Sequence, residues 1–253
     1  IDNCTVPVVV DFEMADITKG KSCYCNKDLT EEELRTLVKT INGKDTIWGV
    51  ANCNIDDKSY AALTFQLNAM FRKYNINECI QKIASLAMTS VETGFFQTAG
   101  EVSGNTASSQ YFYKGRGLLQ LTGSGNQPVM YSDYQQKIGT AHDIINNPDL
   151  VAQKLFLAVD SAGWVWNQIK SPSWPVRDKR SDETQTEFEA KMKASEWKRN
   201  KFPKGLSKNL NGIALLMKEN EEDYFFLISR LLQGYIPTST SDYPTALHLD
   251  RRK

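Results

Sequence analysis

Apolar side chains recur at three- and four-residue intervals along most of this chain, the spacing of one face of an α-helix. The segment LTEEELRTLVKTI, residues 29–41, opens with a helix start signal. Thr30 is the expected N-cap, and Glu33 completes a capping box. Leu29 and Leu34 stand where a hydrophobic staple requires them. The pattern therefore predicts a helix directly after Thr30.

Two more helices are expected next. In LTFQLNAMFRKY one helical face collects the apolar residues Leu63, Leu67, Met70, Phe71 and Tyr74. Asn77 is the expected N-cap of a third helix. Its predicted buried stripe consists of Ile80, Ile83, Ala84, Ala87, Met88 and Val91.

The second half of the chain repeats the pattern after a predicted linker at residues 139–146. Asn147 is the expected N-cap of a fourth helix, with Pro148 at its first position. The apolar residues of that helix include Leu150, Leu155, Ala158, Val165 and Trp166. Two last helices are predicted over 207–218 and 221–233, the second ending at Gly234 as a C-cap.

One stretch, YFYKGRGLLQLTGSGN at residues 111–126, has no helical period. Arg116 stands between Gly115 and Gly117, and Gln120 interrupts an apolar run, so both polar side chains need partners. Thr122 opens a turn of small residues. We expect a short strand or extended segment that carries polar groups into a cleft. A plain β-hairpin edge is the alternative.

Composition excludes several classes of protein. The 253 residues carry 30 basic and 30 acidic side chains, so we expect neither nucleic acid nor an anionic membrane as the main partner. No apolar run is long enough for a membrane span, and no signal peptide is visible. Because the chain begins with Ile1, we expect it to be part of a longer protein. Residues 177–201, of which 14 of 25 are charged, are expected to form a solvated surface or an insertion.

The cysteines and histidines narrow the chemistry. Five cysteines lie in the first third of the chain: Cys4, Cys23, Cys25, Cys53 and Cys79. Because neither paired C-x-x-C spacings nor nearby histidines are present, we expect no zinc site. We expect no other metal and no cofactor either. Disulfides such as Cys4 with Cys23 or Cys25 are one interpretation, and buried free thiols are the other. His142 and His248 are too few, and too poorly placed, for a zinc hydrolase or a Ser-His-Asp enzyme, so carboxylates are the better catalytic candidates.

Two glutamates stand in contrasting surroundings. Glu92 ends the third predicted helix beside apolar and aromatic residues, which favour a protonated carboxyl group. Glu101 follows nine residues later in the polar stretch GEVSGN, where a carboxylate stays ionised. Such a pair can protonate a leaving oxygen and activate a water molecule.

Four blocks in register then resemble glycoside hydrolase family 19, in particular its bacterial and phage peptidoglycan-cleaving branch rather than the plant chitinases. The first two blocks are LNAMFRKYNINECIQKIASLAMTSVETGFFQTAGE and YFYKGRGLLQLTGSGN. The other two are NNPDLVAQKLFLAVDSAGWVW and SKNLNG. Together with CYCNKDLTEEEL upstream, the likeness covers most of residues 23–235.

The resemblance implies a mainly α fold (α+β, lysozyme-like) with a small β element lining a sugar-binding cleft. It implies an N-terminal segment at 1–28, a hydrolase domain at 29–235 with the charged insertion at 177–201, and a tail at 236–253. The catalytic residues that it implies are Glu92 as general acid, Glu101 as general base and Thr122 as a holder of the attacking water. The substrate-binding residues that it implies are Gln120, Asn211 and Tyr111, with Tyr113 as another candidate and Arg116 expected to support the site by pairing with a carboxylate.

The chain departs from the family pattern at two places. Val91 replaces the histidine that usually precedes the first glutamate, which removes an orienting polar neighbour. The pair that closes the core motif is Asn126-Gln127 in place of Asn-Tyr. The nine-residue spacing of the glutamates is that of the peptidoglycan-cleaving branch.

The function implied first is that of a muramidase, which inverts the anomeric centre while hydrolysing the β-1,4 bond of peptidoglycan. A chitinase and an inactive glycan-binding module are the alternatives. The resemblance implies a domain that comes either from a phage lysin or from an antibacterial effector, such as one of type VI secretion, and we favour the effector. It would act on peptidoglycan in the periplasm of the target cell. In the effector case we expect an immunity protein that blocks the cleft.

Overall fold

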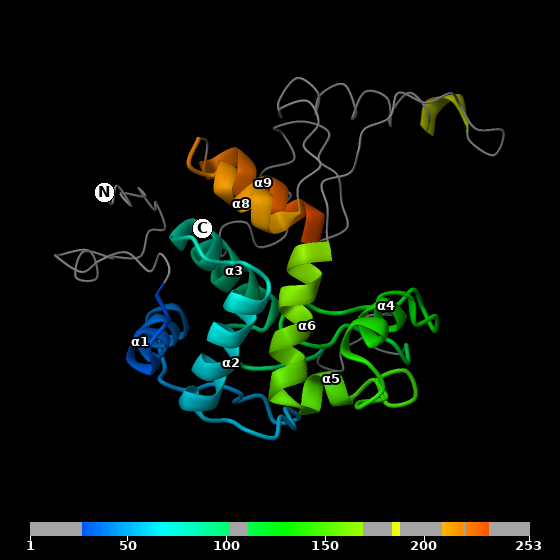
Figure 1. The fold of residues 1–253 in the computed structure, drawn as a ribbon, viewed down its shortest axis with the longest axis horizontal. Coiled ribbons are helices and arrows are strands. Elements are labelled where there is room, and N and C mark those ends of the chain that lie inside the picture. Colours follow the sequence, from blue (N-terminus) through cyan, green and yellow to red (C-terminus); the bar gives the residue numbers. More distant parts are fainter. Residues whose placement is uncertain (1–26, 102–110, 169–183, 188–208, 220, 233–253) are drawn as a thin grey trace. The chain divides into compact units, whose positions relative to one another are not determined.

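Helices make up most of the described structure (Figure 1). The computed structural model describes residues 27–101, 111–168, 184–187, 209–219 and 221–232. Its helices are α1 (Glu31–Asn42), α2 (Tyr60–Lys73), α3 (Cys79–Glu92), α4 (Val129–Ile138), α5 (Leu150–Gln153), α6 (Leu155–Gln168), α8 (Leu210–Leu216) and α9 (Glu221–Leu232). The β structure in the described part of the chain consists of isolated β-bridges near Arg116 and Ser124. The prediction of a mainly α fold with a small β element is confirmed.

The chain divides into two compact units, with the boundary between Asn167 and Gln168 at the end of α6. Helices α1 to α6 belong to the first unit, and α8 and α9 pack on each other in the second. Nearly all of the predicted segment 1–28, the tail 236–253 and most of the charged stretch 177–201 lie outside the described residues. None of the described helices is long and apolar enough to cross a membrane.

Helix α1 begins as its sequence predicts. Thr30 Oγ1 accepts a hydrogen bond of 3.2 Å from the Glu33 N–H, and Glu33 Oε2 accepts one of 2.8 Å from the Thr30 N–H. The capping box is therefore complete, and Leu29 and Leu34 are both buried. Leu29 is held further by Asn68 of α2, whose buried side chain exchanges two hydrogen bonds with its backbone.

Helix α2 buries the predicted face. Helix α3 differs from its prediction in its N-cap and in its buried face. The N-cap of α3 is Glu78 and not Asn77, because Gln81 Oε1 accepts the N–H groups of both residues at 2.9 and 3.0 Å. Half of the predicted stripe is wrong: Ile83, Ala87 and Val91 are only partly buried. The buried face is rotated toward polar residues, namely Gln81, Lys82, Ser85, Thr89 and Ser90. Gln81, Lys82 and Ser90 form side-chain hydrogen bonds to the backbone.

The single helix expected after Asn147 is also corrected. Asp149, rather than Asn147, is the N-cap of α5, and Lys154 then adopts an extended conformation (φ −99°, ψ 112°) that separates α5 from α6. Asp56 holds this break from a distant loop. Its Oδ1 accepts the Leu155 N–H at 2.9 Å, while its own N–H donates to the Gln153 oxygen at 2.8 Å. A contact between residues 99 positions apart in the sequence therefore separates α5 from α6.

Helix α4, which the apolar pattern did not predict, supplies the fully buried rings of Tyr131 and Tyr134. Tyr134 and Tyr74 both donate to Asp160 Oδ2, at 2.8 and 3.2 Å, and Lys73 Nζ pairs with Asp160 Oδ1 at 2.6 Å. Burial first, and the Asp160 charge second, raise the pKa of both tyrosine hydroxyls above the ordinary value. Asp160 thus joins α2, α4 and α6 through hydroxyl groups that stay protonated.

Close packing of α2 against α6 depends on Gly163. A Cβ atom at this position would overlap the ring of Tyr74 and Cγ of Met70. We therefore expect Gly163→Ala to lower the free energy of unfolding by about 2 kcal/mol, although alanine favours a helix over glycine by about 1 kcal/mol. Chemical denaturation measures the change. Gln136→Ala, on the exposed side of α4, is the control and should leave stability nearly unchanged. A stabilised Gly163→Ala protein would contradict the packing described here.

Candidate active site

The first candidate carboxylate stands at the end of α3, where the chain reverses sharply. Thr93, fully buried, donates from Oγ1 to the Thr89 oxygen at 2.7 Å and accepts the Phe96 N–H at 2.8 Å. Gly94, Phe95 and Phe96 are all left-handed, with φ of 57°, 63° and 61°. Two consecutive non-glycine residues in this region cost free energy, so the surrounding contacts must hold them. The reversal places Glu92, which is partly buried, at the turn itself.

The second carboxylate is held by the glycine-arginine segment. Residues 99–101 pair with residues 115–117: the Glu101 N–H donates to the Gly115 oxygen at 3.0 Å, and the Gly117 N–H donates to the Ala99 oxygen at 2.8 Å. The Gly115 N–H then donates to Glu101 Oε2 at 3.0 Å. A single residue of the segment thus fixes both the backbone and the carboxylate of Glu101.

Glycine is required at positions 115 and 117 for two different structural reasons. A Cβ at Gly115 would overlap the side-chain oxygen of Gln120, so only glycine leaves room for this side chain. Gly117 has a φ of 78°, and a Cβ there would meet Ser161 and the Ala158 backbone of α6. Glycine at 117 therefore lets the segment lie directly on α6, where the Leu118 N–H donates to the Ala158 oxygen at 3.0 Å.

Gln120 links the two carboxylate segments. Its Nε2 donates to the main-chain oxygen of Glu92 at 3.2 Å, while its Oε1 is buried against Gly115 and finds no hydrogen-bond partner in the described structure. Gln120 itself has a left-handed φ of 52°. Thr122 continues this series of contacts, since its Oγ1 donates to the main-chain oxygen of Gln120 at 2.6 Å. The structure therefore brings Gln120, Thr122, Glu101 and the backbone of Glu92 together.

Arg116 is the buried anchor of the segment. Its side chain is 5% exposed, and its Nε and Nη2 lie 2.8 and 2.7 Å from Asp149 Oδ1. Nη1 donates to the oxygens of Phe112 and Lys114 and to the Tyr131 hydroxyl, at 3.0 to 3.2 Å. The predicted pairing of Arg116 with a carboxylate is confirmed. Burial raises the pKa of Tyr131 to about 12 against the opposing Arg116 charge, so its hydroxyl remains a donor to the Lys114 oxygen.

The remaining predicted site residues lie in different surroundings. Tyr111 is 42% exposed at the start of the segment, whereas Tyr113 is buried and donates to the Ile145 oxygen at 2.9 Å. Tyr113 is therefore a packing residue. Asn211 is buried in α8 of the second unit, so its predicted sugar contact stays a prediction. The other roles in binding and catalysis likewise stay predictions.

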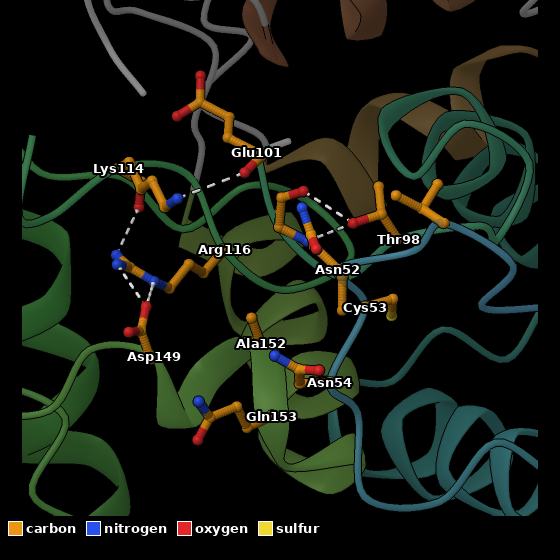
Figure 2. Close-up of a pocket in the computed structure, with 13 residues that line it drawn as sticks. Asn52, Cys53, Asn54, Thr98, Glu101, Lys114, Arg116, Asp149, Ala152 and Gln153 are labelled. Carbon is orange, nitrogen blue, oxygen red and sulfur yellow. Dashed lines mark hydrogen bonds and ion pairs between the residues drawn. The ribbon is translucent and has the colours of Figure 1, made fainter. Parts of the chain in front are cut away.

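A small pocket lies beside Glu101 (Figure 2). Its volume is about 180 Å³, and loop 50–54, residues 98–101 and residues 149–153 supply most of its wall, with Lys114 and Arg116. Sequence reasoning found neither this pocket nor the roles of Asp149 and Tyr131. Within the described part of the chain, no three His, Cys, Asp or Glu side chains gather as metal ligands. Cys79 is disulfide-bonded, and Cys53 is a buried free thiol at the pocket wall.

No family model matches the chain, and two curated relatives match it over short segments. The chain is 43% identical over 54 residues to the acidic endochitinase pcht28 of Solanum chilense, which covers 21% of this chain and 20% of that protein. It is 40% identical over 63 residues to the acidic 26 kDa endochitinase of Solanum lycopersicum, which covers 24% and 23%. The chain thus spans about a quarter or less of the curated relatives it matches. The predicted resemblance is confirmed for these segments only as a likeness to chitinases. Both relatives are plant endochitinases, so the preference for the peptidoglycan-cleaving branch stays a prediction.

Among solved structures, chitinase C from Streptomyces griseus HUT6037 aligns with 87% of this chain and 97% of its own. The sequence identity is 16% and the TM-score is 0.39. A score of this size does not establish a common fold. The architecture therefore rests on the helices and contacts described above.

The buried position of Arg116 generates a stability prediction. Arg116→Met should lower the free energy of unfolding by about 3 kcal/mol, because it removes the buried donor to the Phe112 oxygen, the Lys114 oxygen and the Tyr131 hydroxyl. The matched control is Arg72→Met, which removes an ion pair with Asp28 whose side chains are 55% and 63% exposed. This control substitution should lower the free energy of unfolding by less than about 1 kcal/mol. Urea denaturation of both variants makes the comparison, and equal losses would contradict the anchoring role of Arg116.

Proposed function

We propose that this protein is a glycoside hydrolase that cleaves the β-1,4 bond of a glycan by an inverting, two-glutamate mechanism. The observation that carries the proposal is the connection from Glu92 through Gln120 and Gly115 to Glu101. It holds two carboxylate-bearing segments at a fixed separation. Inverting glycosidases need such a pair, with room between the carboxyl groups for one water molecule.

In this mechanism Glu92 is the general acid. Its proton passes to the glycosidic oxygen while the bond from that oxygen to the anomeric carbon breaks. Glu101 is the general base: it takes a proton from a water molecule, whose oxygen attacks the anomeric carbon from the opposite face. Glu92 ends ionised and Glu101 ends protonated, and exchange with solvent restores both. The hydrogen bond from the Gly115 N–H orients the Glu101 carboxylate for this step.

Thr122 holds the attacking water in our proposal. Its hydroxyl donates its hydrogen to the Gln120 oxygen, so its lone pairs point elsewhere and accept from water. The water then donates one hydrogen to Thr122 and the other to Glu101. Both acceptors belong to segments that are fixed by main-chain hydrogen bonds, which keeps the water in an attacking position.

We propose peptidoglycan as the substrate and a muramidase as the activity, on the resemblance of the core motifs to the peptidoglycan-cleaving branch. The domain would then act in the periplasm of a target bacterium, delivered as a phage lysin or a secreted effector. The disulfide at Cys79 supports an oxidising compartment. An immunity protein that covers the cleft would be the partner in the effector case.

A chitinase is the second candidate. The observation that favours it is the name of the two plant relatives, both endochitinases, with 43% and 40% identity over their matched segments. Peptidoglycan and chitin share the β-1,4 linkage of N-acetylated sugars, so the same carboxylates serve either polymer. Only the products distinguish the two activities.

The first functional prediction concerns the carboxylate pair. Glu92→Gln and Glu101→Gln should each lower kcat by about 10²- to 10⁴-fold, because each removes one proton transfer. The measurement is mass spectrometry of the fragments released from purified peptidoglycan, with chitin as the comparison polymer. Fragments with a new reducing end on muramic acid identify a muramidase.

Glu32→Gln, an exposed substitution on α1, is the matched control and should retain full activity. All three variants should unfold at the temperature of the parent within a few degrees. A Glu101→Gln protein with near-parental activity would remove the base from this mechanism. Cleavage of chitin alone by the parent would replace the muramidase with the chitinase.

The second functional prediction concerns Thr122. Thr122→Val keeps the volume but removes the hydroxyl, so kcat should fall about ten- to hundredfold with little change in KM. Thr122→Ser should retain most of the activity. Thr40→Val, which removes a hydroxyl that likewise donates to a main-chain oxygen, is the control on α1. A Thr122→Val enzyme that changes only in KM would place Thr122 in substrate binding instead.

A further inference from the structure

The pocket beside Glu101 shares one residue with the groups that the proposed mechanism uses. Of those groups, Glu101 lines it, whereas Glu92, Gln120 and Thr122 do not. The catalytic groups and the pocket lie on different sides of the pairing between residues 99–101 and 115–117, because successive residues of paired segments face opposite sides. The Gly115 N–H meets the Glu101 carboxylate, and the next side chain, Arg116, lies in the pocket wall. The Glu101 carboxylate points away from Asn54 and Gln153 (Figure 2).

Charges of both signs line this pocket. Lys114 Nζ has one contact in the described structure, the Glu101 main-chain oxygen at 3.5 Å, and no described carboxylate lies within ion-pair distance of it. Asp149 is 58% exposed and uses Oδ1 for both of its contacts with Arg116. No described residue bonds to its Oδ2. One ammonium group and one carboxylate oxygen therefore remain for a ligand.

Amide groups complete the wall. Asn52, Asn54 and Gln153 line the pocket together with the small apolar side chains of Val50 and Ala152. The volume of about 180 Å³ lies below the range of about 300–1,000 Å³ that is usual for whole small-molecule ligands. The pocket therefore suits one residue-sized group and not a length of glycan.

We propose that this pocket binds the peptide stem of the glycan, as an amino-acid-like group that carries both a carboxylate and an ammonium. Lys114 takes the carboxylate, Asp149 Oδ2 takes the ammonium, and the side-chain amides bond the peptide groups. The inference rests on the proposed glycosidase function and deepens it. Chitin has no such substituent, so the pocket makes this a site for stem-bearing peptidoglycan.

Lys114→Met tests the proposal, because methionine keeps the length of the side chain and removes its charge. On soluble glycan fragments that carry tetrapeptide stems, KM should rise about tenfold while kcat changes less than about twofold. On the same fragments after amidase removal of the stems, neither constant should change. Lys114→Arg should restore the low KM, and Lys137→Met, an exposed lysine on α4, should behave as the parent.

A binding measurement separates this inference from the proposed activity. Isothermal titration calorimetry of the free stem tetrapeptide should detect binding to the parent and a loss of about tenfold or more in Lys114→Met. Binding by a parent protein that cleaves no glycan would refute the glycosidase and leave the pocket assignment standing. Equal effects of Lys114→Met on stem-bearing and stem-free fragments would overturn the inference, as would the absence of tetrapeptide binding by an active parent.

Discussion

The candidate site depends on one buried cation. Arg116 lies almost entirely inside the first unit, and its guanidinium meets Asp149, two main-chain oxygens of its own segment and the Tyr131 hydroxyl. A buried charge is tolerated only where each donor has a partner. The hydrogen bonds and the ion pair of the Arg116 guanidinium therefore fix the bend of residues 112–116, the start of α5 and the position of α4. Residues 99–101 pair with this same segment, which fixes the position of Glu101.

A second constraint acts on the other side of the segment. Gln120 occupies the space that the missing side chain of Gly115 leaves, and from there it reaches the last carbonyl group of α3. The end of α3 is itself strained, with left-handed residues at 94–96. Loop 46–50 holds this turn: the Trp48 N–H donates to the Phe96 oxygen, and the Gln97 side chain bonds the loop backbone. Backbone strain beside two carboxylates is typical of a site that is organised before its ligand arrives.

The same architecture separates chemistry from recognition in our proposals. Residues on one side of the 115–117 pairing carry the bond cleavage, and residues on the other form the small pocket. Glu101 belongs to both, through its carboxylate and its main-chain oxygen. A ligand group in the pocket would thus lie close to the base without contacting the reacting water. The specificity of such a site can change without loss of its catalytic groups.

The sequence by itself determined the features that depend on neighbours three or four residues apart. The capping box at Thr30 and the buried face of α2 follow from local periodicity, and the glycine-arginine motif marked the site. Tertiary structure decided the rest. The break at Lys154, the N-cap of α5 and the partner of Arg116 depend on contacts that span 99 and 33 residues. Local pattern carries no information on such contacts, because they form only when distant segments pack together.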